Sequence, residues 1–438
     1  MEQAELIPHL FRTEYRKIVS VLCYLFGIEH IEVAEDIVSD TFLLATELWV
    51  VKGTPENPTA WLYKVAKNKT KDYLKHNAIF AQKISKELRY TTNTTEEIEL
   101  DLTKRNIADS QLAMMFAICH PCISIEAQIC LSLNLLCGFG AEEIADAFLT
   151  NKDVIYKRLK RAKEKLRTEK VQIEQPGLIE INKRLPTVLT TLYLLFNEGY
   201  YSSSQNTTLR KDLCLEAMRL NYLLVENDIT NNNSVNALLA LMCFHSSRFE
   251  ARINQNGENI LYQDQDTTLW NKELIDKGEY YLDQASQGNQ LSKYHVEAAI
   301  AYWHTHKEDT KEKWENILQL YNKLLQIEYS SIAALNRTFA LAKANGKTEA
   351  IIEAEKLNLT DNHFYYSLLG NLYTDIDNIK ALQYFRTALT LANSDTDKAT
   401  IARNIDGLIK NKKTTAIKQD LFGHAVPPMK SNVVQNGD

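Results

Sequence analysis

The sequence predicts an all-α protein of more than one domain. At roughly 100 to 200 residues per domain, its 438 residues correspond to two or three domains. Glycine and proline number only 14 and 8. Both residue types are unfavourable inside helices, so their scarcity favours a helical chain. Apolar residues recur at helical spacing along most of the chain. These observations favour a mostly helical, soluble protein whose domains each bury a core.

Several classes of protein are disfavoured by composition. The N-terminal stretch MEQAELIPHLFRTEYRK is charged, and no apolar run approaches the ~18 residues that cross a bilayer. Seven cysteines in a chain of this size do not indicate a disulfide framework. We therefore expect a cytoplasmic protein with reduced thiols and no membrane partner. The net charge of −6 argues against a uniformly basic nucleic-acid binder.

The first strong helical pattern is acidic. In VAEDIVSDTFLLATELW, apolar residues at Val33, Ile37, Leu44 and Leu48 lie along one side of a helix. Residues 29–47 contain six acids and no lysine or arginine. Such a face is either solvated or directed at a partner.

The second pattern is basic. The prolines and glycine of KGTPENPTAW end the preceding helix, and Thr59 is the expected cap of the next. That helix, AWLYKVAKNKTKDYLKH, has five lysines and one acid. Trp61 could stack on a base, but its place in the apolar AWL pattern favours burial. The polar stretch 91–103 then indicates a linker.

A helix-turn-helix is predicted within residues 124–170. Three helical patterns follow one another, and only the turn TN separates AEEIADAFL from KDVIYKRLKRAKEKLR. In the last helix, Ile155, Leu159, Ala162 and Leu166 define the inward face. Residues 151–170 carry nine lysines or arginines against three acids, a balance of +6. An ordinary solvated basic helix is the alternative, and DNA binding is the favoured interpretation.

The motif CHPC at residues 119–122 has three interpretations. A redox dithiol needs a strand before the helix, whereas helical spacing precedes this motif. A zinc site needs about four ligands, and Cys130, the candidate fourth, lies in an apolar helical pattern. Pro121 ends one helix and Ser124 is a plausible cap for the next. A structural turn is therefore favoured over thiol chemistry or a metal.

The remaining chain is expected to be helical to about residue 411. ALAKANGKTEAIIEAEKL and NLYTDIDNIKALQYFRTAL align at an offset of 31 residues, pairing Leu341 with Leu372, Ala350 with Ala381, and Ala354 with Phe385. This spacing resembles tetratricopeptide helix pairs and favours a helical solenoid over an irregular bundle. Such repeats also suggest a protein partner. The last residues are expected to be a disordered tail.

Several of these segments resemble extracytoplasmic-function (ECF) RNA polymerase sigma factors. ISIEAQICLSLNLLCGFGAEEIADAFLTNKDVIYKRLKRAKEKLR resembles their promoter −35-binding domain. AEDIVSDTFLLATELW and GTPENPTAWLYKVAKNKTKDYLKH resemble the polymerase-binding helix and the −10-binding segment that follows it. CHP matches a turn of the family, from which Cys122 departs. RLPTVLTTLYLLFNEGYYSS and KYHVEAAIAYWHT resemble the C-terminal extension of the group that carries tetratricopeptide-like repeats.

The resemblance implies an all-α fold with two small helical sigma domains, the second a helix-turn-helix, and a C-terminal helical-repeat (tetratricopeptide-like) domain. The expected parts are sigma region 2 at 1–80, an acidic linker at 81–107, sigma region 4 at 108–172, a regulatory domain at 180–411 and a disordered tail at 412–438.

It also implies core RNA polymerase and promoter DNA as partners. Glu35, Asp36 and Asp40 are assigned to the polymerase. Contacts to the −10 element are assigned to Lys64, Lys67, Asn68, Lys69, Lys71 and Lys75, where cations hold the backbone of melted DNA. Base or backbone contacts at the −35 element are assigned to Asn151, Lys152, Asp153, Tyr156, Lys157, Arg158, Lys160, Arg161 and Arg167.

No enzyme activity, metal or other cofactor is expected. Glu198 in NEGY could suggest a catalytic carboxylate, but it lacks a partner acid, a His cluster or a nucleotide loop at useful spacing. The resemblance to the C-terminal extension implies instead a structural or interdomain junction at Asn197, Glu198, Gly199 and Tyr200. Two alternative functions remain: a helix-turn-helix regulator that acts without polymerase and senses a ligand or protein through its repeats, and a scaffold in which the repeats dominate.

Overall fold

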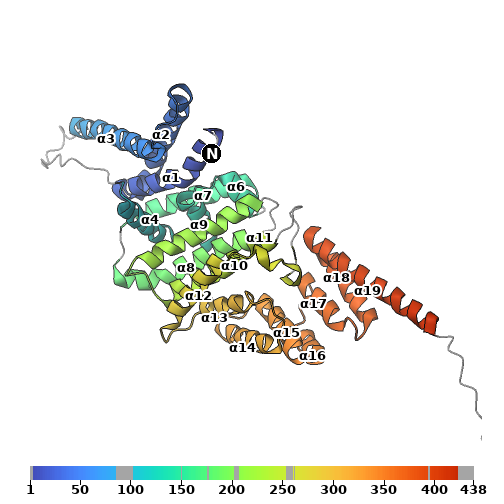
Figure 1. Cartoon of the computed structure of the whole chain (residues 1–438). Coiled ribbons are helices and arrows are strands. Elements are labelled where there is room, and N and C mark those ends of the chain that lie inside the picture. The colour runs from blue at the N-terminus through green and yellow to red at the C-terminus, as the bar shows by residue number, and fades with distance from the viewer. Residues whose placement is uncertain are drawn as a thin grey trace, which may run out of the picture. The chain divides into compact units, whose positions relative to one another are not determined.

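The computed structural model describes residues 3–84, 102–148, 150–174, 177–201, 207–252, 260, 262–392 and 395–422. Within these ranges the regular elements are 19 α-helices and a few short helical turns, with no strand (Figure 1). The all-α prediction is confirmed. The chain divides into two compact units, one formed by Met1–Gly257 with Asp264–Thr305 and the other by Glu258–Gln263 with His306–Asp438. This division falls inside the expected 180–411 domain.

The first unit opens with three helices that pack on one another. They are α1 (Gln3–Phe26), α2 (Ile31–Lys52) and α3 (Pro58–Ile84), with the short turn η1 (Ile28–His30) before α2. Asn57, rather than Thr59, caps α3, because its side-chain oxygen accepts a hydrogen bond from the Ala60 amide at 3.0 Å. Pro58 takes the first helical position, where a missing N–H costs nothing.

The ends of α3 and α4 shorten the expected linker. Helix α3 continues to Ile84, and α4 begins at Lys104 because Thr103 caps it by accepting a hydrogen bond from Asn106 N. Both ends lie inside the interval 81–107. Residues 85–101 of that linker lie outside the described residues.

The next helix, α4 (Lys104–Ile118), packs on several others. Residues 110–118 of α4 are all buried, as expected for a helix covered on every side. Helix α1 packs along it, and α8 and α9 also contact it. The other elements are α5 (Ile125–Leu131), η2 (Ser132–Leu136), α6 (Ala141–Ala147) and α7 (Lys152–Thr168). One continuous apolar core therefore runs through the first unit, from Leu10 to Ala301.

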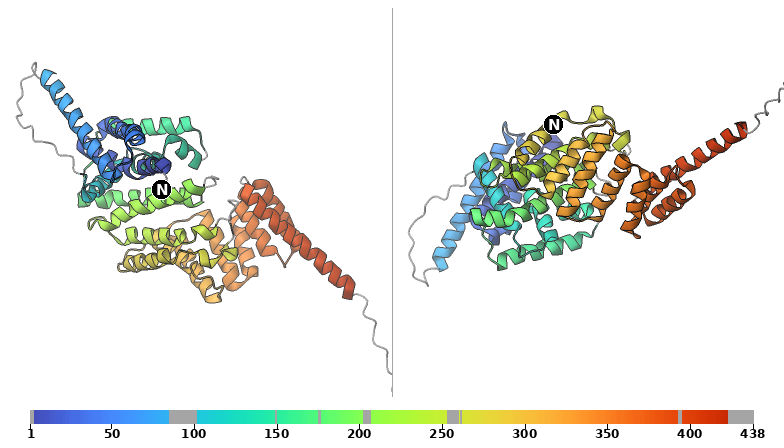
Figure 2. Two further views of the ribbon diagram at one scale, coloured as in Figure 1. Left: turned by 45° about the horizontal axis from the view of Figure 1, so that its top comes forward. Right: turned by 90° about the horizontal axis from the view of Figure 1, so that it is seen from below.

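The remaining helices of the first unit form a layered stack in which α8, α9 and α10 pack in succession (Figures 1 and 2). Gly278 of α12 lies against Phe244 of α10, and a Cβ there would come within 2.5 Å of the phenyl ring. Close packing of these two helices therefore requires glycine. The elements are α8 (Leu178–Tyr201), α9 (Thr207–Glu226), α10 (Asn233–Ser246), α11 (Phe249–Arg252), η4 (Thr267–Leu269), α12 (Lys272–Ser286) and α13 (Lys293–Trp303). The turn η3 (Tyr262–Asp264) falls where the chain passes from the second unit back to the first.

The second unit is a series of helices in which each packs on the next. Positions paired by the offset of 31 are buried in both copies: Leu341 and Leu372, Ala350 and Ala381, Ala354 and Phe385. A Cβ on Gly370 would approach the Phe385 ring to 2.8 Å, so the second pair also needs a glycine at its crossing. Its helices are α14 (Lys311–Ile327), α15 (Ser331–Asn345), α16 (Lys347–Leu357), α17 (His363–Tyr373), α18 (Asn378–Leu391) and α19 (Asp395–Phe422).

The last described helix passes the point where the tail was expected to begin. Helix α19 runs to Phe422, so it includes residues 412–422 of the segment predicted to be a disordered tail. This stretch has no proline or glycine to stop the helix. Residues 423–438 lie outside the described part of the chain.

Candidate nucleic-acid interface

Helix α7 follows α6 after a short connection. The Asn151 side chain caps it, accepting a hydrogen bond from Asp153 N at 2.8 Å. Ile155, Leu159, Ala162 and Leu166 are its buried residues, as the spacing predicts. Helix α6 packs against it across the short connection. Tyr156 is 55% exposed, so the N-terminal half of α7 presents side chains to solvent.

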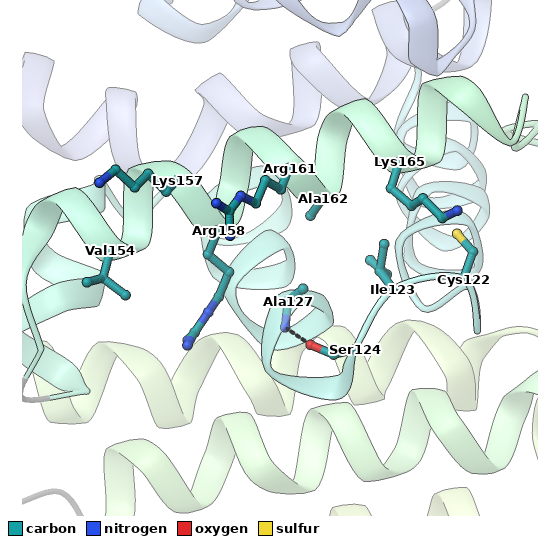
Figure 3. A pocket seen from close by; sticks show the side chains of 10 residues that line it. All are labelled: Cys122, Ile123, Ser124, Ala127, Val154, Lys157, Arg158, Arg161, Ala162 and Lys165. Atoms are coloured by element: carbon teal, nitrogen blue, oxygen red, sulfur yellow. Dashed lines mark hydrogen bonds between the residues drawn. The ribbon is translucent and has the colours of Figure 1, made fainter.

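A groove of about 630 Å³ runs along one side of α7 (Figure 3). The start of α5, with Ser124 and Ala127, forms its other wall. No Asp or Glu occurs among the described residues that line it. Four cationic side chains do line it: Lys157, Arg158, Arg161 and Lys165. A polyanion backbone fits such a surface, because each neutralised phosphate releases counterions.

Arg158 is held at the base of this groove rather than extended into solvent. It is half-buried, and its guanidinium donates to Cys130 Sγ at 3.7 Å. Burial raises the pKa of the Cys130 thiol, although the hydrogen bond and charge of Arg158 oppose this shift. Cys130 is thus a packed thiol that orients an arginine.

The CHPC motif lies at one end of the groove and is a helix boundary. Helix α4 ends at Ile118, and Ser124 caps α5 by accepting a hydrogen bond from Ala127 N (Figure 3). Cys119 is buried and its thiol donates to Thr191 of α8 at 3.6 Å. None of the seven cysteines, all within the described ranges, forms a disulfide. Over those ranges no group of three or more His, Cys, Asp or Glu side chains is placed to hold a metal.

Several predicted −35 contacts have partners within the protein. Lys152 pairs with Glu142 of α6 at 3.1 Å. Lys165, a groove cation outside the predicted set, pairs with Glu169 at 2.7 Å. Arg167 donates to both carboxylate oxygens of Glu32 on α2, at 2.6 and 2.8 Å. Asp153, Lys157, Lys160 and Arg161 are exposed.

The predicted −10 residues lie along α3. The side chains of Lys64, Asn68 and Lys75 are exposed, and those of Lys67, Lys69 and Lys71 are half-buried. Lys69 pairs with Asp40 of α2 at 3.4 Å. Trp61 is half-buried and packs edge-on against buried Trp49 at 5.4 Å, in agreement with a core role. The end of α3 projects from the rest of the first unit (Figure 2).

Helix α2 places its acids on two neighbouring faces. Asp36 and Asp40 are exposed and share a face with Leu43, Glu47 and Val50, which follow at helical spacing. Leu43 is 58% exposed and Val50 is 79% exposed. The sequence interpretation missed this mixed acidic and apolar stripe. The available signal was the pair Leu43 and Val50, seven residues apart and in register with the acids Asp36, Asp40 and Glu47.

Glu35 does not share that open face. Its carboxylate is half-buried between Arg16 of α1 and Lys163 of α7, each at 3.0 Å. Burial would raise the pKa of Glu35, but the charges of Lys163 and Arg16 and their hydrogen bonds outweigh burial and lower that pKa. Two predicted functional sets, the acids of α2 and the cations of α7, are therefore joined to each other. Lys163 and Glu32 were not among the predicted site residues.

Helices α8 and α9 pack against the helices that carry α7. Thr191 of α8 donates to Gln128 of α5 at 3.3 Å. Arg219 of α9 donates to the Gln111 side chain at 3.0 Å and to the Leu136 carbonyl at 3.2 Å. Helices α8 and α9 together contact α4, α5 and α6, so they buttress the scaffold on which α7 rests.

The NEGY segment, Asn197 to Tyr200, lies in the last turn of α8 and packs against neighbouring helices. Tyr200 stacks on Phe196 and lies against His245 at 4.5 Å between ring centroids. The Arg252 guanidinium lies 3.8 Å over the Tyr200 ring. Burial raises the pKa of Glu198, while Asn197 is half-buried and Gly199 buried. These contacts link α8, α10 and α11.

Comparison with known proteins agrees with part of this assignment. Residues 10–78 match the sigma-70 region 2 family, and residues 184–286 match a family of unknown function, DUF6596. The chain is 29% identical over 402 residues to an uncharacterized protein, R00370, of Rhizobium meliloti (strain 1021), covering 88% of this chain and 92% of that protein. No solved structure matches the chain.

The N-terminal match supports a sigma-factor role in transcription initiation, which is a non-enzymatic role. It also implies contact with core RNA polymerase and promoter DNA. Helices α6 and α7 lie between the two matched segments. Among the described helices, none is long and apolar enough to span a bilayer.

Proposed function

We propose that the chain is an alternative sigma factor of the ECF type, cytoplasmic, with a C-terminal helical domain that regulates it. The observation that carries this proposal is the joint occurrence of a sigma-70 region 2 segment and a capped basic helix beside a cation-lined groove. A sigma factor needs these two DNA-binding parts in one chain. Sigma region 2 at 1–80, region 4 at 108–172 and the regulatory domain at 180–411 are the parts in this proposal.

The promoter −35 element binds along α7 in this proposal. The exposed side chains near its start contact base edges, and the groove cations contact the backbone. Asn151 sets the helix start rather than reading a base, because its side-chain oxygen is engaged by Asp153 N. Arg161 and Lys157, which are exposed and line the groove, are the strongest candidates for phosphate contacts.

The −10 element binds along α3, where Lys64, Asn68 and Lys75 are exposed. Stabilising unpaired bases needs stacking or capture, with cations along the displaced backbone. Core polymerase binds the open face of α2, through Asp36 and Asp40 together with Leu43 and Val50. An interface of this kind combines an apolar centre with a polar rim.

Transcription from a genomic promoter library with purified core polymerase tests the proposal. With the full chain, defined start sites that share two spaced elements are expected. If the chain binds those DNA fragments but yields no polymerase-dependent start sites, it is a regulator that acts without polymerase. If it binds neither DNA nor polymerase, the scaffold alternative holds. Salt is held constant, because phosphate contacts make affinity salt-dependent.

A single substitution, Leu43→Asp, distinguishes a sigma factor from a regulator that acts without polymerase. Placing a charge at the centre of an apolar contact should weaken core polymerase binding about tenfold or more, since central apolar anchors dominate interfaces. Ile179→Asp is the matched control, because Ile179 is 84% exposed on α8, away from the proposed contact. Equal polymerase affinity for both variants, measured by titration with labelled chain, would contradict this use of α2.

A further inference from the structure

The turn that follows α4 forms one end of the cation-lined groove. Cys122, Ile123 and Ser124 of this turn line the groove together with the cations of α7. Figure 3 shows Cys122 and Ile123 at that end, beside Lys165. The position of the turn relative to α7 therefore determines the shape of the groove at this end.

Gln128 of α5 holds the turn in place. Its side chain is buried, with 2% of the residue exposed. Its Nε2 atom donates to the carbonyl oxygens of His120 at 3.3 Å and Ile123 at 3.2 Å. Because both amide hydrogens are used in this way, the Oε1 atom of Gln128 is left to accept a hydrogen bond. The two carbonyls lie at either end of the turn, so one side chain ties the whole turn to α5.

The donor to Gln128 comes from the C-terminal helices. The hydroxyl of Thr191 on α8 donates to Gln128 Oε1 at 3.3 Å, and Thr191 is 1% exposed. The same hydroxyl lies 3.0 Å from the Thr187 carbonyl of its own helix and accepts from the thiol of Cys119 at 3.6 Å. A buried amide oxygen without a donor is unfavourable. The orientation of Gln128 therefore depends on the side chain that α8 presents to it.

Apolar packing holds α8 against α4 and α5, and it does not need these hydrogen bonds. Val188, Leu192 and Leu195 of α8 belong to the core that also contains α4 and α5. Hydrophobic contact is non-directional, whereas a hydrogen bond is strong only over a narrow range of angles. The apolar contacts therefore keep the helices together, and the polar contacts fix the position of the turn.

We propose that Thr191 and Gln128 form a hydrogen-bonded relay through which the C-terminal helices set the shape of the groove that binds −35 DNA. Both are positioning residues, because the turn lies between them and the groove. Thr191 falls in the segment that matches the family of unknown function, so the relay gives that segment a role in DNA binding. The identity of the groove's ligand rests on the proposed function, and the relay itself rests on the contacts of Thr191 and Gln128.

The thiol of Cys122 provides a probe of the turn in the full chain. Cys122 is half-buried, whereas the other six cysteines are buried. Labelling with N-ethylmaleimide, followed by mass spectrometry, measures how often the turn opens. Thr191→Val keeps the shape of the side chain and removes the hydroxyl, so it should speed labelling of Cys122 about fivefold. Gln128→Met should speed it further, because both turn carbonyls then lose their donor. The buried thiols should stay protected in both variants.

The effect on DNA binding is measured in the complex with core polymerase. Thr191→Val should weaken binding to −35 duplex about threefold, since the end of the groove is no longer fixed. Bound duplex should also protect Cys122 from labelling in the original chain, because Cys122 lines the groove.

Two further variants distinguish the hydroxyl from packing. Thr190→Val is the matched control on the same helix, because the Thr190 hydroxyl donates to the Pro186 carbonyl at 2.9 Å and should leave Cys122 unaffected. Thr191→Ser keeps the hydroxyl and should label as slowly as the original chain. If Thr191→Ser labelled as fast as Thr191→Val, the methyl group would be responsible and the relay would be refuted. Simultaneous labelling of Cys119 and Cys130 in Thr191→Val would equally refute it, because the hydroxyl would then hold the core rather than the turn.

The outcomes separate the relay from the proposed function. Labelling of the free chain needs neither DNA nor polymerase. Faster labelling of Cys122 in Thr191→Val, with no −35 duplex bound by the original chain, would remove the proposed function and leave the relay. Unchanged labelling in Thr191→Val would overturn the relay. Duplex binding that stays equal in the original chain and Thr191→Val, despite faster labelling, would refute the link to DNA and leave the sigma-factor function intact.

Discussion

Helices α3 and α7 are both strongly basic, yet their charges have different surroundings. Helix α7 lies in the packed core of the first unit, where Lys152, Lys163 and Arg167 each have an acidic partner on another helix. Helix α3 projects outward (Figure 2) and keeps Lys64 and Lys75 exposed. Similar composition therefore leaves different charges available to DNA. Tertiary contacts decide which cations can act.

The difference extends to what holds each helix in place. Helix α3 packs on α1 and α2. Helix α7 rests on α5 and α6, which in turn pack on α8 and α9. We infer that loss of the C-terminal helices would weaken binding to −35 DNA far more than binding to −10 DNA.

The largest expected effect comes from ending the chain after residue 172. Removing α8 and α9 exposes the sides of α4 and α5 that they cover, including Gln111, Cys119 and Gln128, all buried in the full chain. Buried polar groups that lose partners cost about 1 to 3 kcal/mol each. Binding to −35 duplex should fall at least about 100-fold, the ratio that about 2.7 kcal/mol represents. Fluorescence anisotropy with labelled duplex measures it.

The same truncated chain offers a control within itself. Its helices α1 to α3 do not pack on α8 or α9. Affinity for core polymerase should therefore change by less than about threefold, because distant sites are nearly independent. If the truncated chain supported transcription and bound −35 DNA as well as the full chain does, α7 would not depend on the C-terminal helices any more than α3 does.

Single alanine substitutions should sharpen the comparison with a smaller effect. In the complex with core polymerase, Arg161→Ala should weaken −35 duplex binding about tenfold and reduce the salt slope by about 1, as loss of one phosphate contact requires. Lys64→Ala should leave −35 binding intact and weaken binding to a single-stranded −10 oligonucleotide a few-fold. Lys272→Ala, an exposed lysine of α12, is the control.

If Arg161→Ala and Lys64→Ala weakened both elements equally, the separate assignments of α7 and α3 would not hold. Double-mutant cycles would then show whether the two helices act through one shared contact.

The smallest expected effect is an acid dependence of the contact that Glu35 of α2 makes with Arg16 and Lys163. The pKa of Glu35 is lowered in the folded chain. The stabilisation is therefore present above the ordinary glutamate pKa of about 4.3 and is lost as the pH falls through the folded value. Arg16 of α1 and Lys163 of α7 are the charged groups that face it. X-ray scattering between pH 7 and pH 3.5 should show expansion at the acidic end.

Glu35→Gln isolates this carboxyl from the other acids of the protein. The variant should be partly expanded at pH 7 and should lack the component of the acid transition that belongs to residue 35. An identical pH profile for the variant and the original chain would remove Glu35 from the contact.

The sequence alone determined the features that depend on neighbouring residues. Helical periodicity identified the buried face of α7 at Ile155, Leu159, Ala162 and Leu166, and Pro121 with Ser124 located the helix boundary at CHPC. The 31-residue offset identified equivalent buried positions such as Ala350 and Ala381. These features follow from local backbone preferences and from the 3.6-residue period, which act within a few turns of chain.

Only the tertiary structure decided which charges are paired. Glu35 and Lys163 are 128 residues apart, and nothing in either local pattern indicates that they meet. The sequence grouped Glu35 with Asp36 and Asp40, although a difference of one residue turns it by about 100° around the helix and away from their face. The choice of partner depends on how α1, α4 and α9 pack in the shared core. Long-range packing therefore determined which acids and cations remain open to a partner, because burial and pairing depend on residues brought together from distant parts of the chain.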